Sequence, residues 1–204
     1  MDGLMLDTEK PMIGAWVAAG RIMGLNITEE LAVRTIGLSD NETFKFIAGE
    51  LGVDLDFGEL KKLIFRLFDE EFARGIDHKP GLLNILNHLA SLKIPMAVAT
   101  STHRELAVRK LEIAGISDFF ACLAAGDEVA HSKPAPDIFL MAAEKLGVPA
   151  RDCIGFEDSP AGLQALAAAG IHSVFIKDLV EPPREILETV WKRLGSLNEA
   201  IELF

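Results

Sequence analysis

The sequence has little positive charge, little cysteine and no long apolar run. Its 20 lysines and arginines stand against 31 aspartates and glutamates, giving a net charge of −11. This charge disfavours nucleic acids and anionic membranes as partners, because both reward clustered positive charge. No uncharged apolar run approaches the ~20 residues of a membrane span, and the first residues lack the basic and apolar regions of a signal peptide. We expect a soluble, cytoplasmic protein, and a monomer or weak dimer.

Only two cysteines are present, Cys122 and Cys153, and both fall in apolar, strand-like runs. This placement favours buried free thiols over a disulfide or a metal site. With 204 residues, half of them hydrophobic, the chain can bury a substantial core. Its length fits one domain or two small ones.

Residues 10–77 have the pattern of successive helices, with no strand pattern between them. Apolar residues between positions 60 and 72 follow a helical period, which predicts one buried face. Ser39 with Glu42, and Asp56 before the apolar stripe, are typical helix-start signals. We expect a small helical bundle inserted into another domain.

From residue 78 onward, helical stretches alternate with short apolar runs. Such alternation predicts an α/β fold with a doubly wound parallel sheet and helices on both faces. The four predicted strands are residues 94–99, 119–124, 152–156 and 172–176.

Several residues predict where the helices of this region begin and end. Thr102 with Glu105 has the spacing of a capping box, and Ser159-Pro160 places a cap residue before a first-turn proline. We expect the tail, residues 182–204, to be helical. Glycines expected to end helices are Gly115, Gly147 and Gly170.

Polar residues gather at the chain start and after the predicted strands. The start contains Asp2-Gly3 and Asp7-Thr8. Because doubly wound sheets bind ligands beyond the carboxyl ends of their strands, these segments are expected to share a site. The later polar segments are residues 100–102, 132–137 and 157–159.

Together the four segments resemble the haloacid dehalogenase superfamily of phosphohydrolases, in the branch of sugar-phosphate phosphatases and β-phosphoglucomutase. The resemblance implies an α/β core, residues 1–9 and 78–204, with an inserted helical cap, residues 10–77. It further implies a phosphatase of small phosphorylated metabolites that works through an aspartyl-phosphate with Mg²⁺ as cofactor.

The resemblance also implies roles for individual residues. Asp2 is the general acid/base, and its backbone carbonyl reaches the metal. Thr100 binds a phosphoryl oxygen through its hydroxyl, and Lys133 neutralises the transferring phosphate. Asp158 is the direct metal ligand, with Glu157 as a direct or outer ligand. Each has an ordinary alternative: a solvated terminal acid, a helix cap, a surface lysine or helix N-terminal acids.

Substrate contacts are implied for Thr8, for the Ser101 amide, and for Thr102 and Arg104, although a surface role for Arg104 is an equal alternative.

The family's nucleophilic aspartate would lie one residue before Met1. We therefore expect the natural polypeptide to start upstream, and the 204-residue chain itself to be inactive.

Two other functions remain open from the sequence. One is a phosphohexose mutase, which would need a bisphosphate primer. β-Phosphoglucomutases carry a cap arginine and a histidine soon after the Asp-Thr pair. Here those places hold Asp40 and Lys10-Pro11-Met12, which favours a phosphatase. The other is a non-catalytic phosphate-binding protein that lacks the nucleophile.

Overall fold

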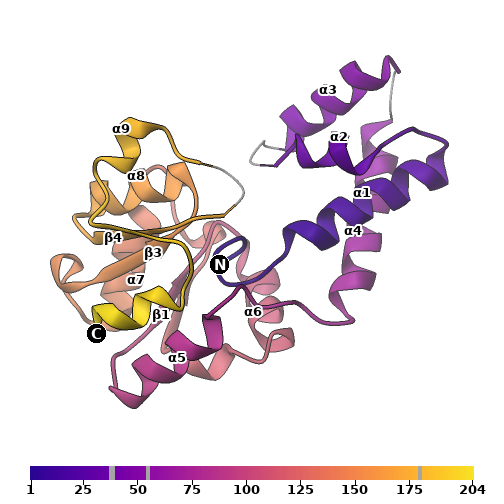
Figure 1. Ribbon diagram of the computed structural model, residues 1–204. Helices are drawn as coiled ribbons and strands as arrows, with labels where there is room; N and C mark the ends of the chain where they lie inside the picture. The colour runs from indigo at the N-terminus through magenta and orange to yellow at the C-terminus, as the bar shows by residue number, and fades with distance from the viewer. Residues whose placement is uncertain (37–39, 54–55, 179–180) are drawn as a thin grey trace. The chain divides into compact units, whose positions relative to one another are not determined.

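The computed structural model describes residues 1–36, 40–53, 56–178 and 181–204, and it divides into two compact units (Figure 1). The first unit comprises Met1–Leu6 and Asp77–Phe204. The second comprises Asp7–Ile76.

The second unit is helical. In it, α1 (Glu9–Met23) packs against both α4 (Phe57–Phe72) and α2 (Glu29–Val33). The apolar residues predicted to form one face of α4 are buried: Leu60, Ile64, Phe68 and Phe72. The helices are α1 (Glu9–Met23), α2 (Glu29–Val33), α3 (Asp40–Leu51) and α4 (Phe57–Phe72).

The predicted start of α4 is confirmed at Asp56. Its carboxylate accepts hydrogen bonds from the backbone N–H groups of Gly58 and Glu59, at 2.9 and 3.2 Å. Such a cap satisfies amides that have no partner inside the helix. The other predicted start, Ser39 with Glu42, depends on a residue outside the described ranges.

The first unit is α/β, which confirms the predicted fold class. It alternates helices with parallel strands. Its elements are α5 (Leu82–Ser91), β1 (Ala97–Ala99), α6 (Arg104–Ile113), η1 (Ser117–Phe119), β2 (Cys122–Ala124), η2 (Gly126–Glu128), α7 (Asp137–Leu146), η3 (Ala150–Asp152), β3 (Ile154–Glu157), α8 (Pro160–Ala169), β4 (His172–Ile176), α9 (Arg184–Leu187), β5 (Lys192–Leu194) and η4 (Glu199–Leu203).

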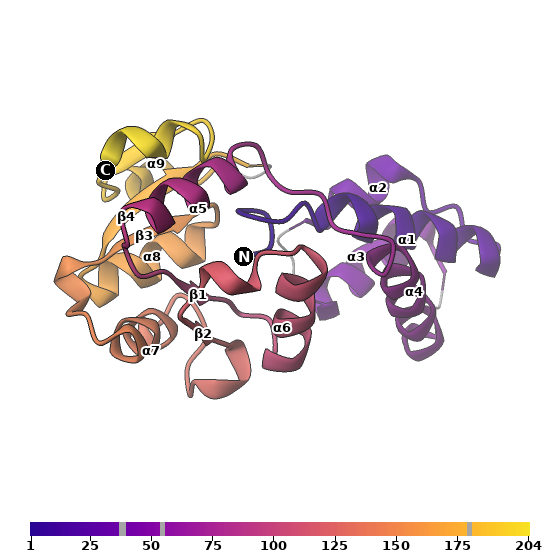
Figure 2. The same cartoon turned by 90° about the horizontal axis from the view of Figure 1, so that it is seen from below.

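The strands form two separate parallel sheets. β1 pairs with β2, with Val98 opposite Leu123. β3 pairs with β4, and β4 with β5, in the order β3-β4-β5. In Figure 2, α5 and η4 lie on one side of the strands, and α7 and α8 on the other. Strands covered on both faces account for the apolar runs in the sequence.

Close packing between α8 and β3 fixes one part of this core. Leu166 of α8 is fully buried, and a Cβ atom on Gly155 would lie 2.3 Å from its side chain. Only glycine therefore fits at position 155 without moving the buried Leu166 side chain. The same cluster includes Ile138 and Phe139 of α7.

Most predicted helix boundaries are confirmed. Ser159 accepts a hydrogen bond from the Gly162 N–H at 3.1 Å, with Pro160 in the first turn of α8. Gly115, Gly147 and Gly170 have φ values of 66–70°, the left-handed conformation that ends helices.

The capping box predicted at Thr102 and Glu105 is wrong. The N-cap of α6 is His103, without a side-chain cap. The Thr102 hydroxyl instead donates to the Asp2 carboxylate at 2.9 Å. The Thr102 hydroxyl thus binds Asp2, which is distant in the sequence, instead of capping the helix that follows it.

The prediction of a helical tail is also wrong in part. The only α-helix among the described residues of the tail is the short α9, and Lys192–Leu194 forms β5 on the edge of the sheet. The Trp191 N–H donates to the Ser173 carbonyl at 2.9 Å. Pairing with β4 holds Lys192–Leu194 in an extended conformation, so no helix can run through the tail.

Both cysteines are free thiols, as predicted, and both are half-buried. Burial raises the pKa of each thiol above its ordinary value. In the described part of the chain, we find no helix with the length and apolar character to cross a membrane.

The packing of α8 generates a stability prediction. Leu166→Ala should lower the free energy of unfolding by about 2–5 kcal/mol, because it leaves a cavity in a close-packed core. Leu140→Ala is the matched control, since Leu140 is 42% exposed on α7. It should cost roughly 0.5 kcal/mol or less. Urea unfolding followed by circular dichroism measures both, and equal losses would contradict the packing argument.

Candidate active site

The candidate site begins at the tight turn formed by the first six residues. The N–H groups of Met5 and Leu6 donate to the Met1 carbonyl, and the Gly3 N–H donates to the Leu6 carbonyl at 3.0 Å. Gly3 has a φ of +75°, and a Cβ atom there would lie 2.4 Å from an Asp158 carboxylate oxygen. Glycine is therefore required here, both for its conformation and for its size.

This turn places Asp2 among residues that follow β1. Its carboxylate accepts hydrogen bonds from the Thr102 hydroxyl, at 2.9 Å, and from the Lys110 ammonium. Lys110 belongs to α6 and is almost fully buried. Burial alone would raise the pKa of Asp2, but Lys110, the charge of the chain's amino group and the two hydrogen bonds outweigh it. The pKa of Asp2 therefore lies below its usual value, and the carboxylate is ionised at neutral pH.

The loop after β1 is held in place by Gly126. A Cβ atom at this position would lie 2.1 Å from the Ser101 carbonyl oxygen, and the Gly126 N–H donates to the Thr102 carbonyl. Thr100 is buried, and its hydroxyl accepts a 3.2 Å hydrogen bond from the Thr102 N–H. The hydroxyl hydrogen remains available for donation.

At the end of β3, Glu157 forms a buried ion pair with Lys133. The Lys133 Nζ lies 3.0 Å from Glu157 Oε2, and the side chains are 11% and 5% exposed. Ser159 donates to the other oxygen, Oε1, at 2.5 Å. Burial would raise the pKa of Glu157, but Lys133, the chain's amino group and Ser159 lower it below its usual value. A Cβ atom on Gly162 would lie 2.1 Å from the Glu157 carboxyl, so glycine there gives the carboxyl room.

Asp158 lies next to this pair in a different environment. Burial, and next the charge of Glu157, raise the pKa of Asp158 to about 6. Among the described residues, no side chain donates a hydrogen bond to the Asp158 carboxylate. Asp178 approaches the same turn, with an oxygen 3.2 Å from the position of a Gly3 Cβ. Asp178 forms an ion pair of 2.7 Å with Lys79.

Comparison with known proteins assigns the family. Residues 1–176 match the haloacid dehalogenase-like hydrolases. The chain belongs to this family. That assignment confirms the resemblance found in the four sequence segments.

Two of the relatives are phosphatases by name. The chain is 29% identical over 175 residues to a phosphorylated carbohydrates phosphatase of Thermotoga maritima, covering 86% of this chain and 81% of that protein. It is 30% identical over 186 residues to hexitol phosphatase A of Escherichia coli, covering 90% and 83%.

A solved structure is also similar to the whole chain. It belongs to a Thermotoga maritima protein assigned as a β-phosphoglucomutase. The TM-score is 0.87 at 26% identity, and the match covers 100% of this chain and 94% of that one.

Haloacid dehalogenase-like hydrolases generally use Mg²⁺, and the acidic residues of the site fit this ion unequally. Mg²⁺ takes oxygen ligands, usually one or two carboxylates together with water and substrate phosphate. Asp158 fits, because it is a buried carboxylate with a raised pKa and no side-chain donor in the described part of the chain. Glu157 fits less well, since Lys133 and Ser159 occupy both of its oxygens. Among described residues no group of three or more histidine, cysteine or acidic side chains forms a metal cluster.

Thr8 and Arg104 are the other residues predicted to bind substrate. Thr8 belongs to the helical unit, where it precedes α1 and is buried. Arg104 lies 3.6 Å from Glu128 in an ion pair and is half exposed. Both roles stay predictions.

Sequence reasoning missed Lys110, Asp178 and Lys79. Lys110 had a detectable signal, since it occupies the buried face of α6 together with Ala107 and Leu111. A lysine within an apolar stripe indicates a buried acidic partner. Asp178 and Lys79 have no comparable signal, because 99 residues separate them.

The buried pair at the end of β3 gives a second prediction. Lys133→Met should destabilise the protein by about 3 kcal/mol, because it leaves the Glu157 charge buried without its cation. Adding Glu157→Gln should restore more than half of that loss in urea unfolding. Lys62→Met, at a surface lysine that is 79% exposed, is the control. If the double variant loses the sum of the single effects, the two charges are not coupled.

Asp158 gives a third prediction. Asp158→Asn should raise the metal-free stability at pH 7.5 by on the order of 1 kcal/mol, because it removes an ionised, buried carboxylate beside Glu157. It should also abolish any rise in melting temperature caused by Mg²⁺. Asp152→Asn, whose side chain is 58% exposed, should change neither. Thermal unfolding in EDTA and in Mg²⁺ measures both effects, and an unchanged Mg²⁺ response would exclude Asp158 as the ligand.

Proposed function

We propose that this protein is a Mg²⁺-dependent phosphatase of small phosphorylated metabolites of the sugar-phosphate type. The observation that carries the proposal is the convergence of Asp2, Lys133 and Asp158 around the carboxyl ends of β1 and β3. This is the edge of an α/β sheet where ligands bind. Membership of the hydrolase family and the phosphatase names of the relatives support the same reaction.

Each side chain has a task that its environment suits. Asp2, ionised beside Lys110, is able to accept a proton. Lys133 supplies positive charge where a phosphoryl group would lie, and Thr100 with the Ser101 amide supplies hydrogen-bond donors for its oxygens. A Mg²⁺ ion held by Asp158 would offset the charge of the phosphate.

A phosphohexose mutase is the second candidate, favoured by the similarity to the structure assigned as a β-phosphoglucomutase. The two functions differ in where the phosphoryl group goes. A phosphatase passes it to water, whereas a mutase returns it to a sugar and depends on a bisphosphate primer. Measuring free phosphate and isomerised sugar phosphate in one reaction separates the two.

The activity test measures the release of phosphate from an aryl phosphate and from a panel of sugar phosphates, with Mg²⁺ and with EDTA. It uses this chain and, in parallel, this chain with an apolar strand ending in Phe-Asp added before Met1, and we expect Mg²⁺-dependent release from at least one of the two. In the form that turns over, Asp2→Asn should lower kcat about 100-fold or more, because it removes the proton acceptor. Asp152→Asn is the control for folding and for surface charge.

One outcome would contradict this proposal. Folded polypeptides that release no phosphate in either form would favour a non-catalytic phosphate-binding protein.

A further inference from the structure

The carboxylate of Asp2 receives one donor on each of its two oxygens. The Lys110 ammonium donates to Oδ1, and the Thr102 hydroxyl donates to Oδ2 at 2.9 Å. All three residues belong to the α/β unit. An aspartate side chain turns about only two bonds, so donors on both oxygens define its orientation once the backbone is fixed.

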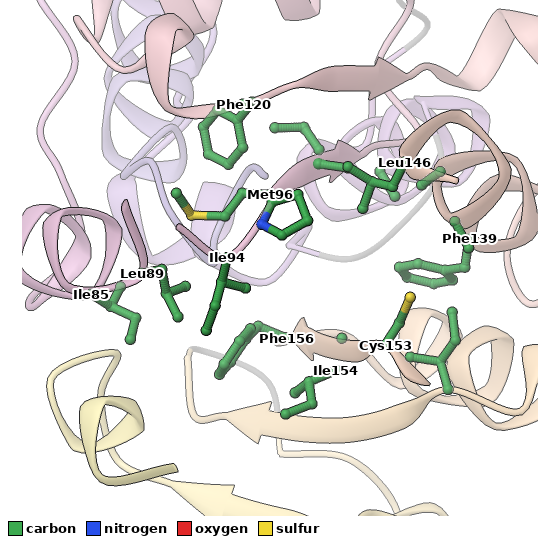
Figure 3. Close-up of a pocket in the computed structure, with 18 of the residues that line it drawn as sticks. Ile85, Leu89, Ile94, Met96, Phe120, Phe139, Leu146, Cys153, Ile154 and Phe156 are labelled. Carbon is green, nitrogen blue, oxygen red and sulfur yellow. The ribbon is translucent and has the colours of Figure 1, made fainter. Parts of the chain in front are cut away.

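The backbone that carries Asp2 is fixed by apolar packing and by the turn. Met1 is buried and lines an apolar cavity of about 430 Å³ that adjoins both sheets. Figure 3 shows Ile94 and Met96, which lead into β1, and Phe156 of β3 among its lining residues. The Met1 carbonyl also accepts the two hydrogen bonds that close the turn. Side-chain rotation is therefore the freedom that remains to Asp2.

Lys110 reaches Asp2 from inside the core. It lies on the buried face of α6 with Ala107 and Leu111, and its side chain is 8% exposed. The Asp2 side chain is 31% exposed. The cation is therefore sealed behind the carboxylate, whereas the carboxylate stays open on part of its surface. A substrate can meet Asp2 without contacting Lys110.

The second donor, Thr102, is held by its own backbone. Its N–H donates to the Thr100 hydroxyl oxygen at 3.2 Å, and its carbonyl accepts from the Gly126 N–H at 3.0 Å. A hydroxyl group has one hydrogen, and here Asp2 receives it. In this arrangement Thr102 has no hydrogen left to donate to a phosphoryl oxygen.

Stability alone does not account for a lysine at position 110. Burying its charge requires desolvation, and apolar residues of similar volume in place of a buried ion pair are often neutral or stabilising. An apolar residue at this position would simply continue the buried stripe of α6. The charge is better accounted for by its effect on the Asp2 carboxylate.

We propose that Lys110 and Thr102 are positioning residues, which together hold the Asp2 carboxylate in the orientation from which it accepts a proton in the phosphatase reaction. Neither of the two contacts the substrate. The inference rests on the proposed function, in which Asp2 is the proton acceptor. It gives Thr102 a task different from the substrate contact that the sequence implied.

Steady-state kinetics with a sugar phosphate, in the form of the chain that releases phosphate, separate positioning from substrate binding. Lys110→Met and Thr102→Val each remove one donor and keep a similar shape. Each should lower kcat about 10–100-fold, because a displacement of about 1 Å costs this much. KM should change by less than about 3-fold. Thr102→Ser, which keeps the hydroxyl, should restore most of the activity, and Lys192→Met, at an exposed lysine of β5, is the control.

Both effects should depend on Asp2. In an Asp2→Asn background, Lys110→Met and Thr102→Val should lower the residual kcat by less than about 2-fold, because residues that act as a unit are not additive. Full losses in that background would overturn the proposal. A raised KM with unchanged kcat in Thr102→Val would also overturn it, by assigning Thr102 to substrate binding.

A second measurement does not depend on catalysis. In urea unfolding, Lys110→Met should raise the unfolding equilibrium constant about 10-fold or more, and adding Asp2→Asn should reverse most of that rise. If neither form of the chain releases phosphate, the proposed function fails, and this coupling still decides whether Lys110 holds Asp2. Additive effects of the two substitutions would overturn the proposal even in an active enzyme.

Discussion

The turn at Asp2-Gly3 holds the candidate site together, because this short piece of chain contacts the ends of both sheets. Asp2 binds Thr102 and Lys110 on the β1 side, while Gly3 lies directly against Asp158 on the β3 side. Any side chain at position 3 would collide with the Asp158 carboxylate. The spacing between the proposed proton acceptor and the proposed metal ligand therefore depends on one glycine.

The charges of the site are arranged as local pairs within an acidic protein. Lys133 is paired with Glu157, Lys110 with Asp2, and Lys79 with Asp178. Buried pairs of this kind contribute little net stability, because desolvation offsets much of the attraction. They do keep cations in place within a chain whose net charge is −11. An anionic substrate would then meet positive charge that is already desolvated and oriented.

Sequence reasoning predicted most of the α/β architecture because its strands are covered on both faces and therefore appear as apolar runs. The strand it missed, β5, is an edge strand of sequence Lys-Arg-Leu. Edge strands carry charge that blocks further pairing, so they lack an apolar signal. The capping box at Thr102 failed for a different reason, since its hydroxyl binds Asp2, 100 positions away. Local patterns cannot specify a partner of that kind.

The proposed site residues also divide into those that local sequence patterns predict and those that depend on distant contacts. The role of Gly162 follows only from the folded structure, where a Cβ atom at this position would lie 2.1 Å from the Glu157 carboxyl. The apolar stripe of α6 marks Lys110 as buried, but it does not identify the partner, Asp2, which is 108 positions away. Residue type and order predicted which side chains would gather at the strand ends. Clearances and ion pairs depend on contacts between distant segments, and these appear only in the folded structure.

The two sheets and the candidate site are linked through Met1. This residue lines the apolar cavity, and its carbonyl accepts the hydrogen bonds that form the turn before Leu6. The packing of Met1 between the two sheets therefore fixes the start of that turn, and with it the carboxylate of Asp2. A change in the apolar side chains around Met1 would shift the same backbone that presents Asp2 to Thr102 and Lys110. The apolar packing of the core thus sets how precisely the acidic groups are held.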